Sequence, residues 1–207
     1  MPNANTPRGL IPYETIWGQK YNGSFNTYYV PSSYATALYI GDPVKMVSGS
    51  NDTNGIPAVN LAASGDTVRG IVIGIINGGD MGAMNTVTRD LPVYHPASTA
   101  QYLAVVDDPN ILFMVQDDAS TQATAPNLWA GKNANLTAGS GGSTVTGYSS
   151  YQLQASSVAT TNTLDLKIIR PLQQADNTIG TSANTNMNAK WLVKLNKSLW
   201  ANQTAGS

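Results

Sequence analysis

The sequence contains no cysteine and little charge. The absence of cysteine excludes disulfide bonds, thiolate metal sites and a cysteine nucleophile, and it fits assembly in a reducing compartment. Charged residues make up 11% of the 207 residues, against roughly 25% in an average soluble protein. The 11 basic residues nearly balance the 12 acidic ones. No run of lysine or arginine occurs, so we expect no nucleic-acid partner.

Long apolar stretches are missing as well. No segment approaches the ~18 consecutive apolar residues of a transmembrane helix. Residues 1–8 have no apolar core behind a basic segment, so they do not resemble a signal peptide. We therefore expect no membrane partner.

Glutamate is nearly absent, since Glu14 is the only one among the 12 acidic residues. Aspartate favours turns and caps, whereas glutamate favours helix interiors. The chain is rich in Asn, Thr, Ser and Gly, which suit strands and loops better than helices. The composition therefore predicts an all-β protein with many turns.

Short apolar runs between turn residues predict the individual strands. They cover residues 28–30, 37–40, 44–47, 56–61, 68–76, 91–94, 101–106, 111–116, 163–169 and 189–195. The four residues at 107–110 have the length of a hairpin connection, and 77–90 reads as a polar loop. This spacing favours an antiparallel β-barrel or a jelly-roll-like sandwich.

The run at 68–76 is the most apolar of the expected strands. Strict alternation places Ile71, Ile73 and Ile75 on one face of the sheet. Gly70 and Gly74 fall on the other face, and glycine inside a strand marks a bulge, a bend or a close approach. We expect a strongly curved sheet here, as in a small barrel.

Three regions differ in character. Residues 1–27 read as an extended N-terminal arm that contains three prolines, residues 28–196 as a single β domain, and 197–207 as a C-terminal tail. Aromatic side chains in the arm need a surface to pack on, which is either their own domain or a neighbouring subunit. The candidate partner-binding residues are Tyr13, Trp17, Tyr21, Phe25, Tyr28 and Tyr29.

Few residues are suited to catalysis. His95 is the only histidine, and it stands at a strand end before Pro96, which favours a structural or surface role. The pairs Asp107-Asp108 and Asp117-Asp118 bracket one expected strand, ~20 Å apart at 3.3 Å per residue. That separation is too long for a glycosidase pair. Turn aspartates explain these pairs best, with loop-bound Ca²⁺ as the alternative.

The order of several segments resembles a family of small tailed-phage virion proteins that decorate or cement the head. The segments are Tyr28-Tyr29-Val30-Pro31, Gly41-Asp42-Pro43-Val44, Gly70-Ile71-Val72-Ile73-Gly74, Tyr94-His95-Pro96-Ala97, Asp107-Asp108-Pro109, Phe113-Met114-Val115-Gln116-Asp117 and Lys190-Trp191-Leu192-Val193-Lys194-Leu195-Asn196. The resemblance covers roughly residues 28–196 and implies binding to the major capsid protein, self-association as a homotrimer or homodimer, and no catalysis. It places the chain on the virion surface, after assembly in the bacterial cytoplasm.

Three functional hypotheses follow from these observations. The first is a non-enzymatic decoration or cement protein without metal or cofactor. The second is a carbohydrate- or receptor-binding virion module, in which exposed aromatic side chains line one groove. The third, a β-barrel enzyme acting through aspartates or His95, is the least supported, because no nucleophile motif accompanies the histidine.

Overall fold

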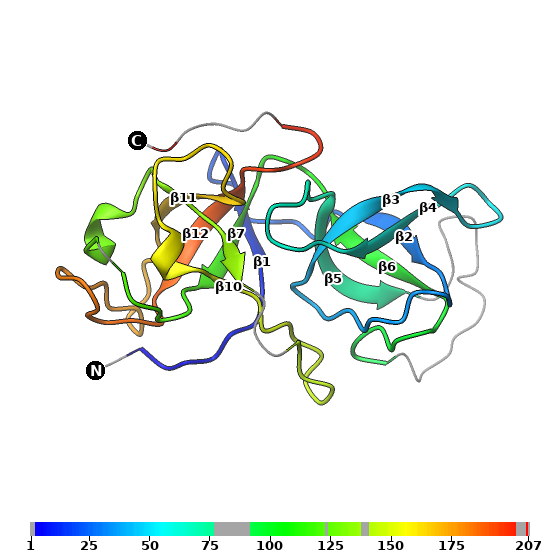
Figure 1. Ribbon diagram of the computed structural model, residues 1–207, viewed down its shortest axis with the longest axis horizontal. Coiled ribbons are helices and arrows are strands. Elements are labelled where there is room, and N and C mark those ends of the chain that lie inside the picture. The colour runs from blue at the N-terminus through cyan, green and yellow to red at the C-terminus, as the bar shows by residue number, and fades with distance from the viewer. Residues whose placement is uncertain (1–2, 77–91, 123, 138–140, 202–205, 207) are drawn as a thin grey trace.

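The computed structural model describes residues 3–76, 92–122, 124–137, 141–201 and 206, and these form an all-β protein, as the composition predicts (Figure 1). Its strands form two bodies that lie side by side in Figure 1. The elements are β1 (Ile11–Thr15), β2 (Asn26–Val30), β3 (Pro43–Asn51), β4 (Pro57–Leu61), β5 (Gly70–Ile76), β6 (Gln101–Val106), β7 (Ile111–Gln116), η2 (Pro126–Leu128), β8 (Asn133–Ala134), β9 (Leu136–Thr137), β10 (Gln152–Leu153), η3 (Ala155–Ser157), β11 (Leu166–Pro171) and β12 (Lys190–Leu195). Within the described ranges, no helix has the length and apolar character needed to cross a bilayer.

The first body, on the right in Figure 1, is a closed barrel of five strands in the order β2-β4-β3-β5-β6. Neighbouring strands run antiparallel except β2 and β4, which are parallel where Tyr29 faces Ala58. The barrel is closed by short contacts, one residue pair between β2 and β4 and two between β3 and β5. The buried side chains inside it, here called the barrel core, are Tyr28, Val30, Leu38, Val44, Val59, Val72, Leu103 and Val105.

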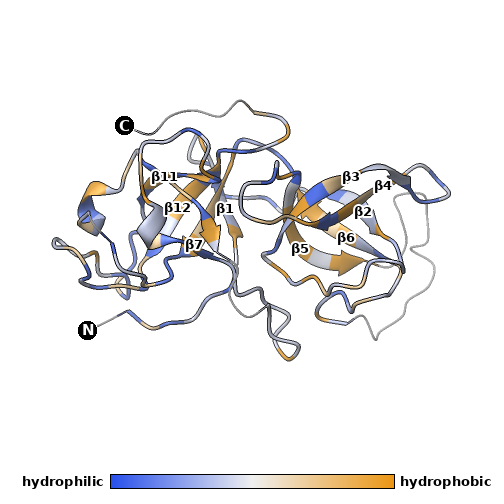
Figure 2. Cartoon of the chain, viewed as in Figure 1, coloured by the Kyte–Doolittle hydropathy of each residue, from blue (hydrophilic) through white to orange (hydrophobic). Residues whose placement is uncertain are grey.

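The second body is a five-stranded sheet in the order β1-β7-β12-β11-β8, next to a two-stranded ribbon of β9 and β10. Its central strand β12 follows the predicted alternation, with Trp191, Val193 and Leu195 buried on one face. Leu192 is buried as well, because β12 lies between β7 and β11 and is covered on both faces. Figure 2 shows the hydrophobic residues concentrated on the strands of both bodies.

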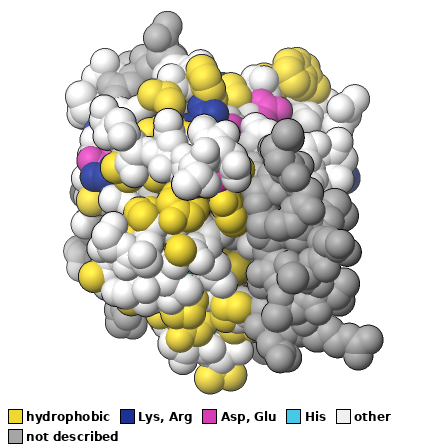
Figure 3. Space-filling view, turned by 90° about the vertical axis from the view of Figure 1, so that its right-hand side faces the viewer, with side chains coloured by type: hydrophobic (Ala, Val, Ile, Leu, Met, Phe, Trp, Pro, Cys, Tyr) yellow, Lys and Arg dark blue, Asp and Glu magenta, His cyan; other side chains and the backbone are white. Residues whose placement is uncertain are grey.

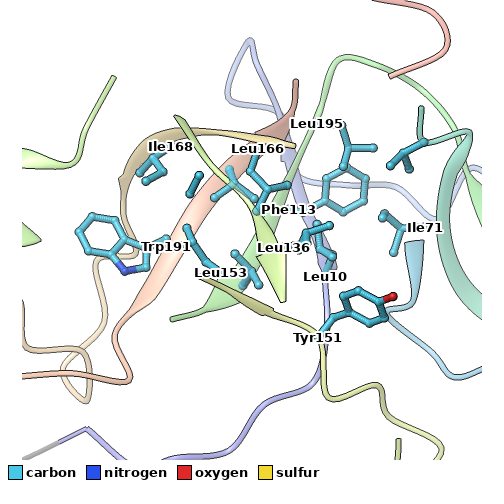
Figure 4. Close-up of a cluster of buried hydrophobic side chains, with 14 of the residues drawn as sticks. Leu10, Ile71, Phe113, Leu136, Tyr151, Leu153, Leu166, Ile168, Trp191 and Leu195 are labelled. Carbon is cyan, nitrogen blue, oxygen red and sulfur yellow. The ribbon is translucent and has the colours of Figure 1, made fainter. Parts of the chain in front are cut away.

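One hydrophobic cluster, here called the shared core, joins the two bodies. It unites Ile71 and Val106 of the barrel with Phe113 and Leu195 of the sheet (Figure 4). Its buried members are Leu10, Ala62, Val68, Ile71, Val106, Ile111, Phe113, Val115, Trp129, Ala134, Leu136, Tyr151, Leu153, Ala155, Leu166, Ile168, Ala189, Trp191, Val193 and Leu195. The barrel and the sheet therefore pack as one unit.

The predicted hairpin at 107–110 is wrong. The flanking strands β6 and β7 have the expected bounds, but β6 pairs with β2 and β5, whereas β7 pairs with β1 and β12. The four residues therefore carry the chain from the barrel into the sheet. Local spacing could not reveal this, because a four-residue connection suits both a hairpin and a change of sheet.

The glycines of β5 indicate a bulge, a bend or a close approach, and the strand has both an irregular register against β6 and a close approach, which correct the predicted face of Ile75. The register against β6 shifts between Val72 and Gly74. Before the shift, Ile71 lies in the shared core; after it, Ile75 packs against the barrel core. At Gly70 the strand passes so close to β6 that a Cβ atom would lie 2.4 Å from the carbonyl oxygen of Val106.

The segment 1–27 is not a free arm along its whole length. Ile11–Thr15 forms β1, an edge strand paired with β7, so part of the expected arm belongs to the sheet of its own chain. The predicted domain at 28–196 consists of two sheet bodies, one of which includes this earlier strand. The expected strand at 37–40 has only isolated bridges at Leu38 and Ile40.

Residues 92–94 are irregular, so the strand expected at 91–94 is not formed there. The loop expected at 77–90 lies outside the described residues, as does residue 91. The strands expected at 44–47, 56–61 and 163–169 correspond to β3, β4 and β11 with shifted ends.

A buried carboxylate holds the junction of the N-terminal segment, the barrel and the segment 147–149. Asp42 is 2% exposed, and it accepts the Tyr39 backbone N–H at 2.8 Å and the Ser149 hydroxyl. The preceding Gly41 carbonyl accepts the Leu10 N–H at 3.0 Å. Burial raises the pKa of Asp42 to about 6, since the environment disfavours its charged form.

This shift predicts a pH dependence of stability. The unfolded carboxyl group loses its proton near pH 4 and the folded one near pH 6, so the folded state binds more protons between these values. The free energy of unfolding should therefore fall by up to about 3 kcal/mol from pH 4 to 6.5. Asp42→Asn should flatten this slope in urea denaturation curves. An unchanged slope in the variant would contradict the assignment.

Candidate functional site

The six aromatic residues predicted to bind a partner divide into buried and exposed groups. Tyr28 is 2% exposed and belongs to the barrel core. Trp17 is 70% exposed and Phe25 48% exposed. Of the six, only Trp17 and Phe25 are exposed, and the other four candidates are buried or half-buried in their own chain.

Tyr13, Tyr21 and Tyr29 are half-buried and in contact with their own chain. The Lys20 ammonium lies 3.9 Å from the Tyr13 ring centroid, a cation–π contact. Tyr21 packs on the shared core, and its hydroxyl donates to the Ser24 carbonyl. The ring of Tyr29 packs against that of Tyr102, with centroids 5.4 Å apart.

Tyr28 belongs to a polar node at the end of the barrel. Its hydroxyl donates to Asp107 Oδ2 at 2.7 Å and accepts from Arg69 Nε. Arg69 Nη2 also lies 2.9 Å from Asp107 Oδ2, and both side chains are about nine-tenths buried. Burial, followed by the nearby Asp107 carboxylate, raises the pKa of Tyr28 to about 12, so the phenol stays protonated at neutral pH.

The node anchors Trp200, an aromatic residue of the expected C-terminal tail that was not among the six partner-binding candidates. The Arg69 guanidinium lies 4.2 Å from the ring centroid of Trp200, which is nevertheless 59% exposed. The backbone N–H and carbonyl of Val68 bond to Lys197 and Leu199, which fixes this part of the tail beside β5. The only sequence feature that pointed to this place was the pair Leu199-Trp200, two adjacent large apolar residues after the last strand.

The turn after β1 projects a second apolar group. Gly18 has φ +84°, a left-handed conformation that glycine adopts without strain, and its N–H bonds to the Thr15 carbonyl. Ile16, 43% exposed, and Trp17 stand at the tip of this turn. The Ile16 N–H donates to the Asn110 carbonyl, which places the turn against the connection between the bodies.

These segments converge on the connection at 107–110 and together form what we call the rim. Asn26, next to Phe25, donates to Asp107 at 2.9 Å, and Asp107 bonds to the arginine beneath Trp200. In Figure 1 the turn after β1, the connection and the tail lie along the upper edge. The rim consists of Ile16, Trp17, Phe25, Leu199 and Trp200.

A second apolar patch, the lower patch, lies at the opposite edge. Val145 is 85% exposed and Val93 47% exposed. Gly147 packs directly against Val93, so the two valines belong to neighbouring segments. Beside them Tyr94 stacks on Tyr39, with centroids 5.2 Å apart. The segment 141–150 lies along the lower edge of Figure 1.

Charged side chains contribute little to the visible surface. In the view of the barrel end in Figure 3, hydrophobic and uncharged polar side chains cover most of the described surface. The few charges are often paired within the chain, as in Glu14 with Lys20 at 3.1 Å and with Arg170 at 2.7 Å. Both partners lower the pKa of Glu14 against the opposing effect of burial.

The residues considered for catalysis have structural roles. His95 is fully buried, its backbone bridges to Leu38, and Nε2 lies 2.7 Å from the Thr99 carbonyl oxygen. Asp117 accepts the N–H groups of Asn188 and Ala189 at 2.7 and 3.0 Å. Burial raises the pKa of Asp117.

The other aspartates of these two pairs cap local turns. Asp108 accepts the Asn110 N–H, and Asp118 accepts the N–H groups of Ser120 and Ala155. Across the part of the chain that the structure describes, no three His, Asp or Glu side chains gather closely enough to hold a metal ion.

Comparison of the chain with models of known families, with curated proteins and with solved structures finds no match.

The node generates a stability prediction. Asp107→Asn removes the anion that neutralises the largely buried Arg69, so unfolding should become easier by about 3 kcal/mol. The matched control is Asp176→Asn, which breaks the Lys190 pair at 2.6 Å, where Asp176 is 68% exposed. That change should cost less than about 1 kcal/mol. Equal losses of the two variants in urea denaturation would contradict the structural role of the node.

Proposed function

We propose that the chain is a structural virion protein that binds the outer surface of a tailed-phage head and cements neighbouring major capsid protein subunits. The observation that supports this most is the presence of two exposed apolar patches, the rim and the lower patch, at opposite edges of one packed unit. A protein that joins neighbours must contact at least two of them, from separate surfaces. The proposal implies no bond-making chemistry.

The surface chemistry suits repeated weak contacts. A cement protein multiplies a modest contact by the symmetry of the shell, so each site needs apolar and hydrogen-bonding area rather than strong ionic pairs. The chain has 11% charged residues and an abundance of Asn, Thr and Ser. Interfaces of this kind are broad, polar at the margin and depleted in charge at the centre. The resemblance in segment order to head decoration proteins supports the same proposal.

A carbohydrate- or receptor-binding virion module is the second candidate. Trp17 and Trp200 are 70% and 59% exposed, and exposed indole rings can stack on sugar rings. The cation–π contact with Arg69 holds the Trp200 ring in place, as a stacking platform requires. A glycan-array signal that disappears in Trp200→Ser would favour this function over cementing.

The direct test uses heads of the phage that encodes the chain, assembled without it. Purified protein should cosediment with these heads and saturate at a fixed number of copies per shell. Val145→Asp and Trp17→Asp each place a charge in one patch and should weaken attachment about tenfold, or 1.4 kcal/mol.

Leu128→Asp is the matched control. Leu128 is 59% exposed in η2, outside both patches, and should bind like the unmodified chain. Heads that never retain the unmodified protein would contradict the proposal. So would an equal loss of attachment in all three variants.

A further inference from the structure

We propose that the rim joins two copies of this chain about a two-fold axis, with Trp17 of each copy inserted into a hollow beside the rim of the other. The inference rests on the proposed function in one respect: the lower patch of each copy contacts the shell, and the neighbour that the rim contacts is a second copy, so the pair joins two capsid sites and a charge at Trp17 weakens attachment by breaking the pair. It assigns the rim to one occupant, a second copy of the same chain.

The hollow lies directly beside the projecting tryptophan. It has a volume of about 170 Å³, and its lining includes Thr15, Gln19, Lys20, Asp108 and Ile111. An enclosed cavity of roughly 150 Å³ holds a benzene ring, so the hollow can receive the six-membered ring of an indole. Thr15 and Gln19 also close the turn that carries Trp17, through the Thr15 N–H and the Gln19 carbonyl at 2.7 Å. A projection and a recess therefore stand side by side on one surface.

That arrangement is self-complementary. In a two-fold interface the same patch of each copy faces the other copy. The projection of each copy can therefore enter the recess of its partner, which gives two equivalent contacts. The Lys20 ammonium, already against the Tyr13 ring, lies at the wall of the hollow and can face an incoming indole ring. Aromatic anchors seated in pockets typically dominate the energy of an interface.

The charges of the region permit this pairing. Arg69 is neutralised by Asp107 at 2.9 Å, and Lys20 by Glu14 at 3.1 Å. Asp108 and Lys20 line the same hollow and have opposite signs. Like charges that face one another across an interface cost several kcal/mol. Because each of these charged groups has an oppositely charged group close by, bringing two rims together avoids most of that cost.

The apolar area of the rim matches that of a standard interface. Large aromatic side chains present about 150–250 Å² each, so the exposed parts of Trp17, Phe25 and Trp200 amount to roughly 400 Å². A standard interface buries about 800 Å² per partner, of which somewhat more than half is apolar. With Ile16 and Leu199 added, the rim supplies that apolar share.

The experiment measures the mass of the full chain by sedimentation equilibrium over a concentration series, with no heads present. The unmodified chain should be a dimer. Trp17→Ser removes the projection, and Gln19→Trp fills the recess. Each should raise the dimer dissociation constant at least about 30-fold, the loss typical of a hot-spot residue. Leu128→Ser and Val145→Ser, exposed outside the rim, should leave the dimer intact.

Thermal unfolding of each variant separates loss of association from loss of folding, since Trp17 and Gln19 are both exposed. A monomeric or trimeric unmodified chain overturns the inference, as does a dimer that persists in folded Trp17→Ser. Sedimentation of the unmodified chain without heads measures the dimer alone, and cosedimentation with heads measures attachment alone. A chain that binds heads as a monomer would refute the dimer alone, whereas a dimer that ignores heads would refute the proposed function alone.

Discussion

The shared core is the constraint on which the rest of the structure depends. The chain crosses between the bodies twice among these strands, through residues 16–25 and through residues 107–110, and these connections alone do not fix how the two bodies pack. Ile71 and Val106 on one side pack with Phe113 and Leu195 on the other, which removes that freedom. Close-packed protein interiors have low compressibility, so a displacement of one body is transmitted to the other.

A buried carboxylate reinforces the same junction. Asp165, 2% exposed at the start of β11, accepts the Ser64 hydroxyl at 2.7 Å and the Gly65 N–H at 2.9 Å from the barrel side. It also accepts the Leu136 N–H at 3.0 Å from the sheet side. A buried carboxylate that receives several N–H and O–H groups is costly to expose or rearrange. The chain thus uses its scarce charges largely to hold segments together.

Because the two bodies pack as one unit, the rim and the lower patch are held at a fixed separation. The rim is assembled from the turn after β1, the start of β2 and the tail after β12, and these meet only because both bodies are packed around the connection. The lower patch lies at the far edge of the same unit. A frame of fixed span between two contact surfaces is the property that a protein joining neighbours requires.

Sequence patterns predicted the positions of the strands far better than they predicted which strands pair with each other. Composition indicated an all-β chain, and the glycines of β5 indicated a bulge, a bend or a close approach in that strand, because these features act within a few residues. The same local reading assigned 107–110 to a hairpin and residues 1–27 to an extended arm without a strand. Pairing between β1 and β7 joins segments about a hundred residues apart, which periodicity does not encode.

The residues of the candidate site were likewise predicted only in part from the sequence. Trp17 and Phe25 were identified, since aromatic residues among prolines and glycines are unusual, but buried Tyr28 could not be told from them. Leu199 and Trp200 were assigned to a tail, because their place beside Arg69 depends on the fold of β5.

Native-state hydrogen exchange of Phe113→Ala tests the shared core most directly. Removing this buried ring from β7 should lower the free energy of unfolding by about 3–5 kcal/mol. If the two bodies form one unit, the slowest-exchanging amides of β5 and β6 in the barrel should lose as much protection as those of β12 in the sheet. Loss confined to the sheet, with barrel protection unchanged, would show that the bodies unfold separately and would contradict the account.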